Sequence, residues 1–204
     1  MPRRIGPVTL TALCLALLLC GARSGLATGI ADNVYTNDEF DFTIGLPAEL
    51  AEAGWRVFEG EPGLSYAVFE GPEVETITVY VEELVEVVPL EAFVEISLFI
   101  FPLIFDDWLE ESSLLIDVNG LLGYEVVYTT TIIGIPTRAV EYMFVTDTHS
   151  FTMSGLFLGD PFPFPLNEFR SIVNTFTLDL GPTTDVSPAA SALTQWARLK
   201  GARR

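Results

Sequence analysis

The two cysteines of this 204-residue chain, Cys14 and Cys20, both lie in one apolar stretch near the N-terminus. The stretch covers about residues 10–22 and follows the basic residues Arg3 and Arg4. A basic start, an apolar run of about a dozen residues and then small residues are typical of a secretory signal peptide. Once this segment is removed the chain has no thiol. Its fold therefore cannot depend on a disulfide or a thiolate metal site, and it has no cysteine nucleophile.

The predicted signal peptide covers residues 1–27, and cleavage needs small residues at positions −3 and −1. The pairs Gly25 with Ala27 and Gly29 with Ala31 both meet this requirement. The apolar run is shorter than the roughly 20 residues that span a bilayer, which disfavours an uncleaved anchor. We therefore expect an extracytoplasmic protein, located in the periplasm, at the cell surface or in the medium.

A lipoprotein is the alternative to simple cleavage. Cys20 ends the run of leucines at positions 17–19 and is a candidate for acylation. Leu19, however, occupies the position where lipoprotein signals usually carry Gly, Ala or Ser. On this alternative a lipid on Cys20 would be the protein's only link to a membrane.

The charge of the remaining chain is strongly negative. Between residues 32 and 180, three arginines face 27 Asp and Glu residues, which leaves a net charge of −24, and no lysine occurs there. Such a surface repels nucleic acid and anionic lipid head groups, whose recognition needs Lys and Arg. The acidic surface has two interpretations. It is either a solvated shell that keeps the protein soluble, or a surface that attracts a basic partner or divalent cations. No Asp-x-Asp-x-Asp-Gly run is present, so we expect neither a metal site nor a cofactor.

Alternating apolar and polar residues predict a domain rich in β-strands over residues 32–180. The sequence Asn119-Gly120 is a strong hairpin-turn signal. Two helices are expected among the strands, one over residues 89–105 and one over residues 165–174. The expected strands cover residues 39–46, 64–70, 74–81, 114–118, 124–132, 138–146 and 150–158.

The segment 89–105 is the strongest helix candidate, because Pro89 is well suited to a first turn. At 100° per residue one apolar face contains Leu90, Phe93, Val94, Leu98, Phe101, Ile104 and Phe105. Three more apolar residues, Ile96, Phe99 and Leu103, fall on the opposite face, where polar residues are expected. Pro102 should kink or end the helix.

After residue 180 the composition changes to Pro, Ser, Thr and Ala, and then to a basic end over residues 196–204. This composition predicts a flexible tail over residues 181–204 with at most a marginal helix.

The ordered set of motifs resembles the PsbP-like superfamily. The motifs are EFDFTIGLP at residues 39–47 with Trp55 after it, VNGLLGYEVVY at 118–128, EYMFV at 141–145 and FRSIVNTFTL at 169–178. This superfamily includes photosystem II extrinsic subunits, bacterial DcrB-type envelope proteins and nuclear Ran-binding Mog proteins. The resemblance implies an α-β-α sandwich, in the α+β class, around a mostly antiparallel sheet of about six strands.

The resemblance also implies a function, because members mostly bind or assemble other proteins and are not known as enzymes. The lack of lysines argues against docking in the manner of the photosystem subunits, and the export signal excludes a nuclear role. We therefore expect a non-catalytic domain whose partner is an unidentified protein or envelope component.

The candidate partner-binding residues are apolar. They are Ile96, Phe99 and Leu103 on the outer helix face, with Phe162 and Phe164 in the stiff loop 161–165. Exposed aromatic clusters often mark binding surfaces. The alternative is that the loop folds over the helix and buries both groups in one extended core.

An extracytoplasmic hydrolase is the second functional hypothesis. It would use the acidic cluster Asp106, Asp107, Glu110 and Glu111, near Trp108, because glycoside hydrolysis needs paired carboxylates. The cluster is expected in a solvent-facing loop. The single histidine, His149, is expected to be solvent-exposed in a turn. No GxSxG motif accompanies it, so we name no catalytic residue.

Overall fold

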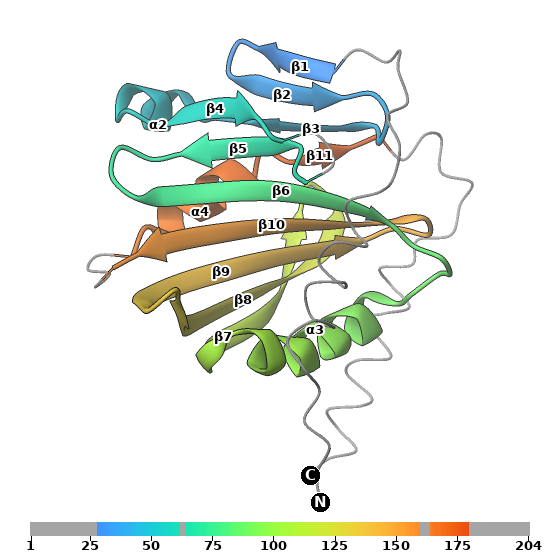
Figure 1. The fold of residues 1–204 in the computed structure, drawn as a ribbon. Helices are drawn as coiled ribbons and strands as arrows, with labels where there is room; N and C mark the ends of the chain where they lie inside the picture. Colours follow the sequence, from blue (N-terminus) through green and yellow to red (C-terminus); the bar gives the residue numbers. More distant parts are fainter. Residues whose placement is uncertain (1–27, 62–63, 160–163, 180–204) are drawn as a thin grey trace, which may run out of the picture.

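The computed structural model describes residues 28–61, 64–159 and 164–179 (Figure 1). The predicted signal peptide with Cys20, the residue Phe162 and the tail 181–204 lie outside the described residues. Within them, no helix has the length and apolar character needed to cross a membrane.

A seven-stranded antiparallel sheet forms the centre of the domain (Figure 1). Its strand order is β4-β5-β6-β10-β9-β8-β7. The long strands β6, β10, β9 and β8 pair in continuous register, which gives the sheet a rigid middle. The strands are β4 (Arg56–Glu59), β5 (Ala67–Glu70), β6 (Glu75–Glu83), β7 (Asp106–Val118), β8 (Leu121–Ile132), β9 (Ile135–Val145) and β10 (His149–Leu158).

A second antiparallel sheet and three helices complete the described part of the fold. The second sheet has the order β1-β2-β3-β11, and its strands are β1 (Thr28–Ala31), β2 (Val34–Asn37), β3 (Phe42–Gly45) and β11 (Thr177–Leu178). The helices are α2 (Ala48–Glu52), α3 (Leu90–Ile104) and α4 (Leu166–Val173).

The main hydrophobic core lies between one face of the large sheet and the elements α4, α2 and the small sheet. Helix α4 is drawn behind the large sheet in Figure 1, and α2 and the strands β1 and β2 are drawn at the top. Helix α4 places Phe169, Ile172 and Val173 in this core, as its apolar spacing predicts. A smaller core lies on the opposite face, where Val94 of α3 packs with Met143 and neighbouring residues of β8 and β9.

The large sheet therefore has a helix on each face, but the expected α-β-α sandwich with about six strands is correct only in outline. The sheet has seven strands, and a four-stranded sheet shares one face with α4. Strands β1, β2 and β4, with four residues each, and β11, with two, were not predicted from the sequence. Strands this short contain too few alternating positions to give a clear pattern.

The segment around the acidic cluster also differs from expectation. Residues 106–113 belong to the long strand β7, not to a loop. Strand β7 is an edge strand with register shifts after Asp106 and after Glu110, and Asp107 has a positive φ of 52°. These irregularities break the two-residue alternation, so the strand could not be recognised from its pattern.

One local prediction is confirmed, and one needs correction. The Asn119-Gly120 turn joins β7 to β8 with φ values of 53° and 86°, in the left-handed region that favours these residues. Helix α3 contains Pro102 and ends two residues later, at Ile104. Ile104, expected to face inward, is exposed.

Candidate functional site

The outer face of α3 is apolar and exposed. Ile96, Phe99 and Leu103 have exposed fractions of 54%, 73% and 66%. Ile100 and Ile104 on the same helix are exposed as well. We call these five residues the α3 surface.

The inner face of α3 explains why the helix is held in place although its outer face is apolar. Val94 is buried, and the rings of Phe101 and Phe105 lie 5.7 and 5.8 Å from the ring of Tyr128 on β8. Contact with the sheet thus fixes one side of the helix and leaves the α3 surface without a covering element among the described residues. Contiguous apolar surface of this kind marks interaction sites in soluble proteins.

Phe164 does not belong to the α3 surface, which corrects the prediction that the two aromatic features form one binding patch. Its ring contacts Phe169 of α4 at 5.5 Å, and the Arg138 guanidinium lies 4.6 Å from its centre. Phe164 packs against the main core, on the face of the sheet opposite α3. Phe162 lies outside the described residues.

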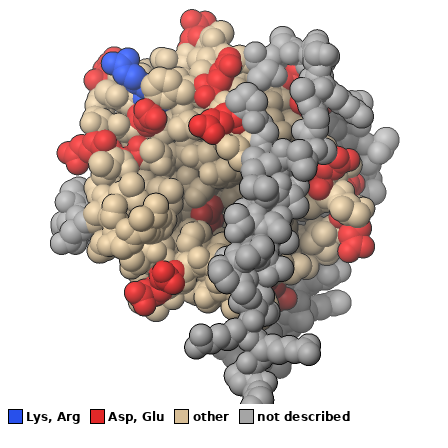
Figure 2. All heavy atoms as spheres, viewed as in Figure 1, with Lys and Arg blue, Asp and Glu red and all other residues tan. Residues whose placement is uncertain are grey.

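A buried carboxyl group, Glu141, lies on the face of the sheet that α3 covers in part. Glu141 is 5% exposed, and its Oε1 accepts hydrogen bonds from Tyr128 Oη at 3.0 Å and Ser154 Oγ at 2.8 Å. The three residues come from the adjacent strands β8, β9 and β10. Figure 2 shows acidic atoms at the floor of a hollow over the middle of this face.

Burial is the main cause that raises the pKa of Glu141 to about 7, and the hydrogen bonds from Ser154 and Tyr128 act in the opposite direction. Burial also raises the pKa of Tyr128, with the nearby carboxylate adding to the effect. No Arg or Lys among the described residues forms an ion pair with Glu141. Burial therefore favours the protonated form of this carboxyl at pH values where an exposed glutamate is ionised.

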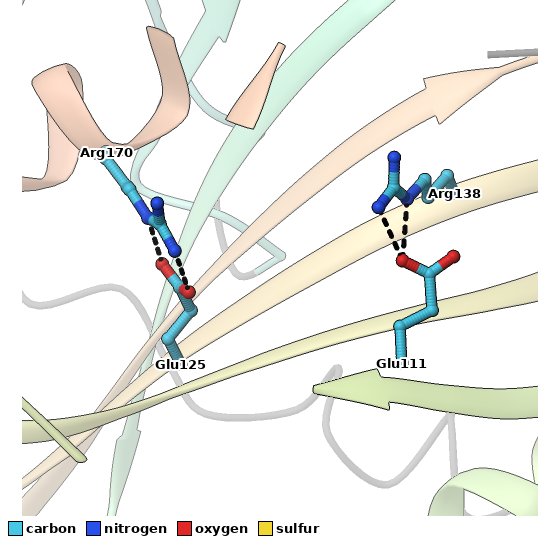
Figure 3. Close-up of polar contacts among 4 residues, drawn as sticks. All are labelled: Glu111, Glu125, Arg138 and Arg170. Atoms are coloured by element: carbon cyan, nitrogen blue, oxygen red, sulfur yellow. Dashed lines mark hydrogen bonds and ion pairs between the residues drawn. The ribbon is translucent and has the colours of Figure 1, made fainter. Parts of the chain in front are cut away.

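Two of the arginines pair with acids, and neither points to a ligand (Figure 3). Arg170 of α4 donates two hydrogen bonds, of 2.8 and 2.6 Å, to Glu125 of β8, whose side chain is 1% exposed. Arg138 of β9 donates through Nε to Glu111 at 2.9 Å. The first pair ties α4 to the sheet, and the second joins β9 to the edge strand β7.

The acidic cluster predicted for a hydrolase does not converge on a cleft. Asp106, Asp107, Glu110 and Glu111 are all exposed along β7. Glu110 accepts a hydrogen bond from Ser113, and Glu111 is paired as described. Among the described residues, no group of three or more His, Cys, Asp and Glu is arranged to hold a metal ion.

His149 begins β10 and is half-buried, so the prediction of a solvent-exposed turn residue is wrong. Its ring packs edge-on against Phe40 at 5.0 Å, and Nδ1 lies 2.8 Å from the Thr148 hydroxyl. The side chain of His149 thus packs against neighbouring residues of the fold and does not project freely into solvent.

Comparison with solved structures decides the fold. Cyanobacterial PsbP (CyanoP) from Synechocystis superimposes with a TM-score of 0.54 at 14% identity, covering 78% of this chain and 98% of that protein. The fold is PsbP-like. LpqN of Mycobacterium tuberculosis, described as involved in cell envelope biogenesis, gives a TM-score of 0.51 at 10% identity, covering 67% and 82% of the two chains. No family model and no curated protein sequence matches the chain.

Glu141 was not among the candidate site residues predicted from the sequence, although its carboxyl is buried and burial raises its pKa. The sequence of strand β9 did contain one indication that Glu141 is unusual. Glu141 falls between Ala139 and Met143 on an alternating apolar face, where a carboxylate must be exposed, paired or protonated. Which of these holds depends on Tyr128 and Ser154 of the neighbouring strands.

Proposed function

We propose that this protein is a non-catalytic extracytoplasmic binding domain that docks a partner protein or envelope component through the α3 surface. The observation that carries the proposal is the exposure of Ile96, Phe99 and Leu103 on a helix whose inner side is fixed to the sheet. The export signal predicted from the sequence and the PsbP-like fold support such a role. LpqN, of similar fold, is described as acting in cell envelope biogenesis.

The composition of the α3 surface favours a partner with an apolar groove or helix. Five apolar side chains on one helix can supply the anchors at i, i+3, i+4 and i+7 that helix-in-groove recognition uses. Glu95, which is exposed on the same helix, lies at the rim, where charge orients a partner more than it contributes affinity. Phe99 is the most exposed of the five and is the expected energetic centre.

The test is co-purification from the native envelope fraction after mild cross-linking. The double variant Phe99→Ser/Leu103→Ser should keep its urea midpoint within about 0.5 M of the parent. It should lose at least about ten-fold of the captured partner, because truncation of a hot-spot residue costs about 2 kcal/mol or more. The matched control is Val85→Ser/Val87→Ser, which removes exposed apolar side chains in the loop before α3. It should leave capture unchanged.

Two results contradict the proposal. If Phe99→Ser/Leu103→Ser unfolds the protein, these side chains belong to the core. If the variant folds and captures the partner as well as the control does, docking occurs elsewhere.

A further inference from the structure

The face of the large sheet that carries Glu141 is only partly covered by a helix. Helix α3 lies against β7, β8 and β9 on this face, whereas α2 and α4 pack on the opposite face. Beyond α3, a cleft of about 530 Å³ lies over β4, β5 and β6. Its lining includes Phe58, Val68 and Tyr80, and both aromatic side chains are exposed. This half of the face is therefore open to a ligand.

Strand register connects Glu141 to this cleft. Ser154 of β10 lies opposite Glu141 of β9, and Thr78 of β6 lies opposite Ser154. Directly opposed residues in an antiparallel sheet have their side chains on the same face. Because Thr78 lines the cleft, Glu141 lies two strands from the cleft wall, about 10 Å at the usual strand spacing. Burial raises the pKa of Tyr80 in the cleft, and the charge of Glu141 adds to this effect.

One oxygen of the Glu141 carboxyl can be reached from the hollow over this face in Figure 2. Both of its described hydrogen bonds, from Tyr128 and Ser154, go to Oε1. The fully buried side-chain polar atoms that lack a partner in the described structure are Trp108 Nε1 and Tyr142 Oη, and Glu141 Oε2 is not one of them. Oε2 is therefore accessible although the residue as a whole is only 5% exposed. An accessible oxygen on a largely buried carboxyl is a point at which a ligand can bind.

The carboxyl favours a cationic ligand. The two ion pairs among the described residues use Arg138 and Arg170 with other acids, so Glu141 has no compensating positive charge there. Burial accordingly raises its pKa to about 7. An ammonium group would supply the missing charge, because N–H bonds to a carboxylate are roughly twice as strong as neutral hydrogen bonds.

The surroundings of Oε2 favour a primary amine with an apolar stem. A primary ammonium has three N–H donors, and the Ser154 hydroxyl, which donates to Oε1, can still accept from a ligand. The ring of Tyr80 and the side chain of Val68 line the path from Glu141 into the cleft. An aromatic ring beside the cation and apolar groups beneath the stem suit such an amphiphile.

From the accessible Oε2, the adjoining cleft and the absence of a cationic partner in the described structure, we infer that this face binds a small amphiphilic primary amine. Its ammonium group binds Glu141 Oε2 and Ser154 Oγ, and its apolar stem lies across Tyr80 and Val68 into the cleft. The site is separate from the α3 surface and does not depend on the docking proposed for it.

Isothermal titration calorimetry of the protein with n-octylamine tests this inference. The titration is made at pH 8, above the pKa of about 7, so that the Glu141 carboxyl is ionised. About 0.15 M NaCl screens the exposed acids of the surface. We expect one amine to bind per chain with a dissociation constant on the order of 1 mM or below. Octan-1-ol has the same stem without the charge and should bind at least about ten-fold more weakly.

Two variants and a control locate the site. Glu141→Gln keeps the shape of the side chain but removes its charge, and should weaken octylamine binding at least about ten-fold. Tyr80→Ala removes the ring beside the stem and should weaken binding about three-fold or more. The control Glu95→Gln removes one exposed acid on α3 and should change the affinity less than about two-fold.

Four results would overturn the inference. The first is no saturable binding of octylamine by the parent protein at about 10 mM. The second is equal binding by Glu141→Gln and Glu95→Gln, which would assign the amine to the acidic surface in general. The third is equal affinity for octan-1-ol and octylamine, because the carboxylate would then play no part. The fourth is binding to phosphatidylethanolamine vesicles without affinity for the free amine, which would favour a membrane surface instead.

Discussion

Replacing Glu141 by Gln should change how the stability of the protein depends on pH. Burial raises the pKa of Glu141 from its ordinary value of 4.5 to about 7, so the folded protein holds a proton that the unfolded chain releases between these values. A raised folded-state pKa gives stability that is complete below pH 4.5 and is lost as pH rises to about 7. At about 1.4 kcal/mol per pH unit, the loss over this interval is about 3 kcal/mol.

The variant Glu141→Gln keeps a neutral side chain of the same shape, which can still accept the hydrogen bonds from Tyr128 and Ser154. Its stability should match that of the parent near pH 4.5 and exceed it by about 3 kcal/mol at pH 8. Urea unfolding followed by the fluorescence of buried Trp55 measures this. With a slope of about 2 kcal/mol per molar urea, the midpoints should separate by about 1.5 M at pH 8.

Comparing the urea midpoints of Glu141→Gln and a control variant, Glu86→Gln, at each pH removes the general effect of the acidic surface on stability. Glu86→Gln takes away one exposed carboxylate in a loop and should follow the parent at every pH. A constant difference between Glu141→Gln and the parent from pH 4.5 to 8 would refute the reasoning. So would a difference that grows toward acid.

Three further substitutions test the packing described above, each by the urea midpoint. Arg170→Met should destabilise the fold by about 2 kcal/mol, because the Glu125 side chain is 1% exposed and loses its charged hydrogen-bond donor. The loss is no larger because the Arg170 side chain is itself partly exposed to water. Gly155→Ala places a methyl group 2.8 Å from the ring of Phe169 and should lower the free energy of unfolding by about 2 kcal/mol. An unchanged urea midpoint would refute this prediction. Gly120→Ala meets open space but has a φ of +86°, so about 1 kcal/mol of backbone strain is expected.

The local order of residues determined much of this fold. The alternating strands, the Asn119-Gly120 turn and the two longer helices were predicted because each depends on neighbours within a few positions. Helical spacing also placed Ile96, Phe99 and Leu103 on the helix face opposite the main apolar stripe, and the structure shows that they are exposed there. The excess of acid is a property of composition and needs no structure, and the export signal is a prediction from the N-terminal sequence alone.

Tertiary structure alone decided which residues meet. The sequence did not show that Glu141 is buried beneath Tyr128 and Ser154, because that contact joins three strands through their register. It likewise did not place Phe164 on the face opposite α3. Periodicity specifies the face on which a side chain lies, whereas the partners across a sheet depend on strand order and register, which bring together residues far apart in the chain.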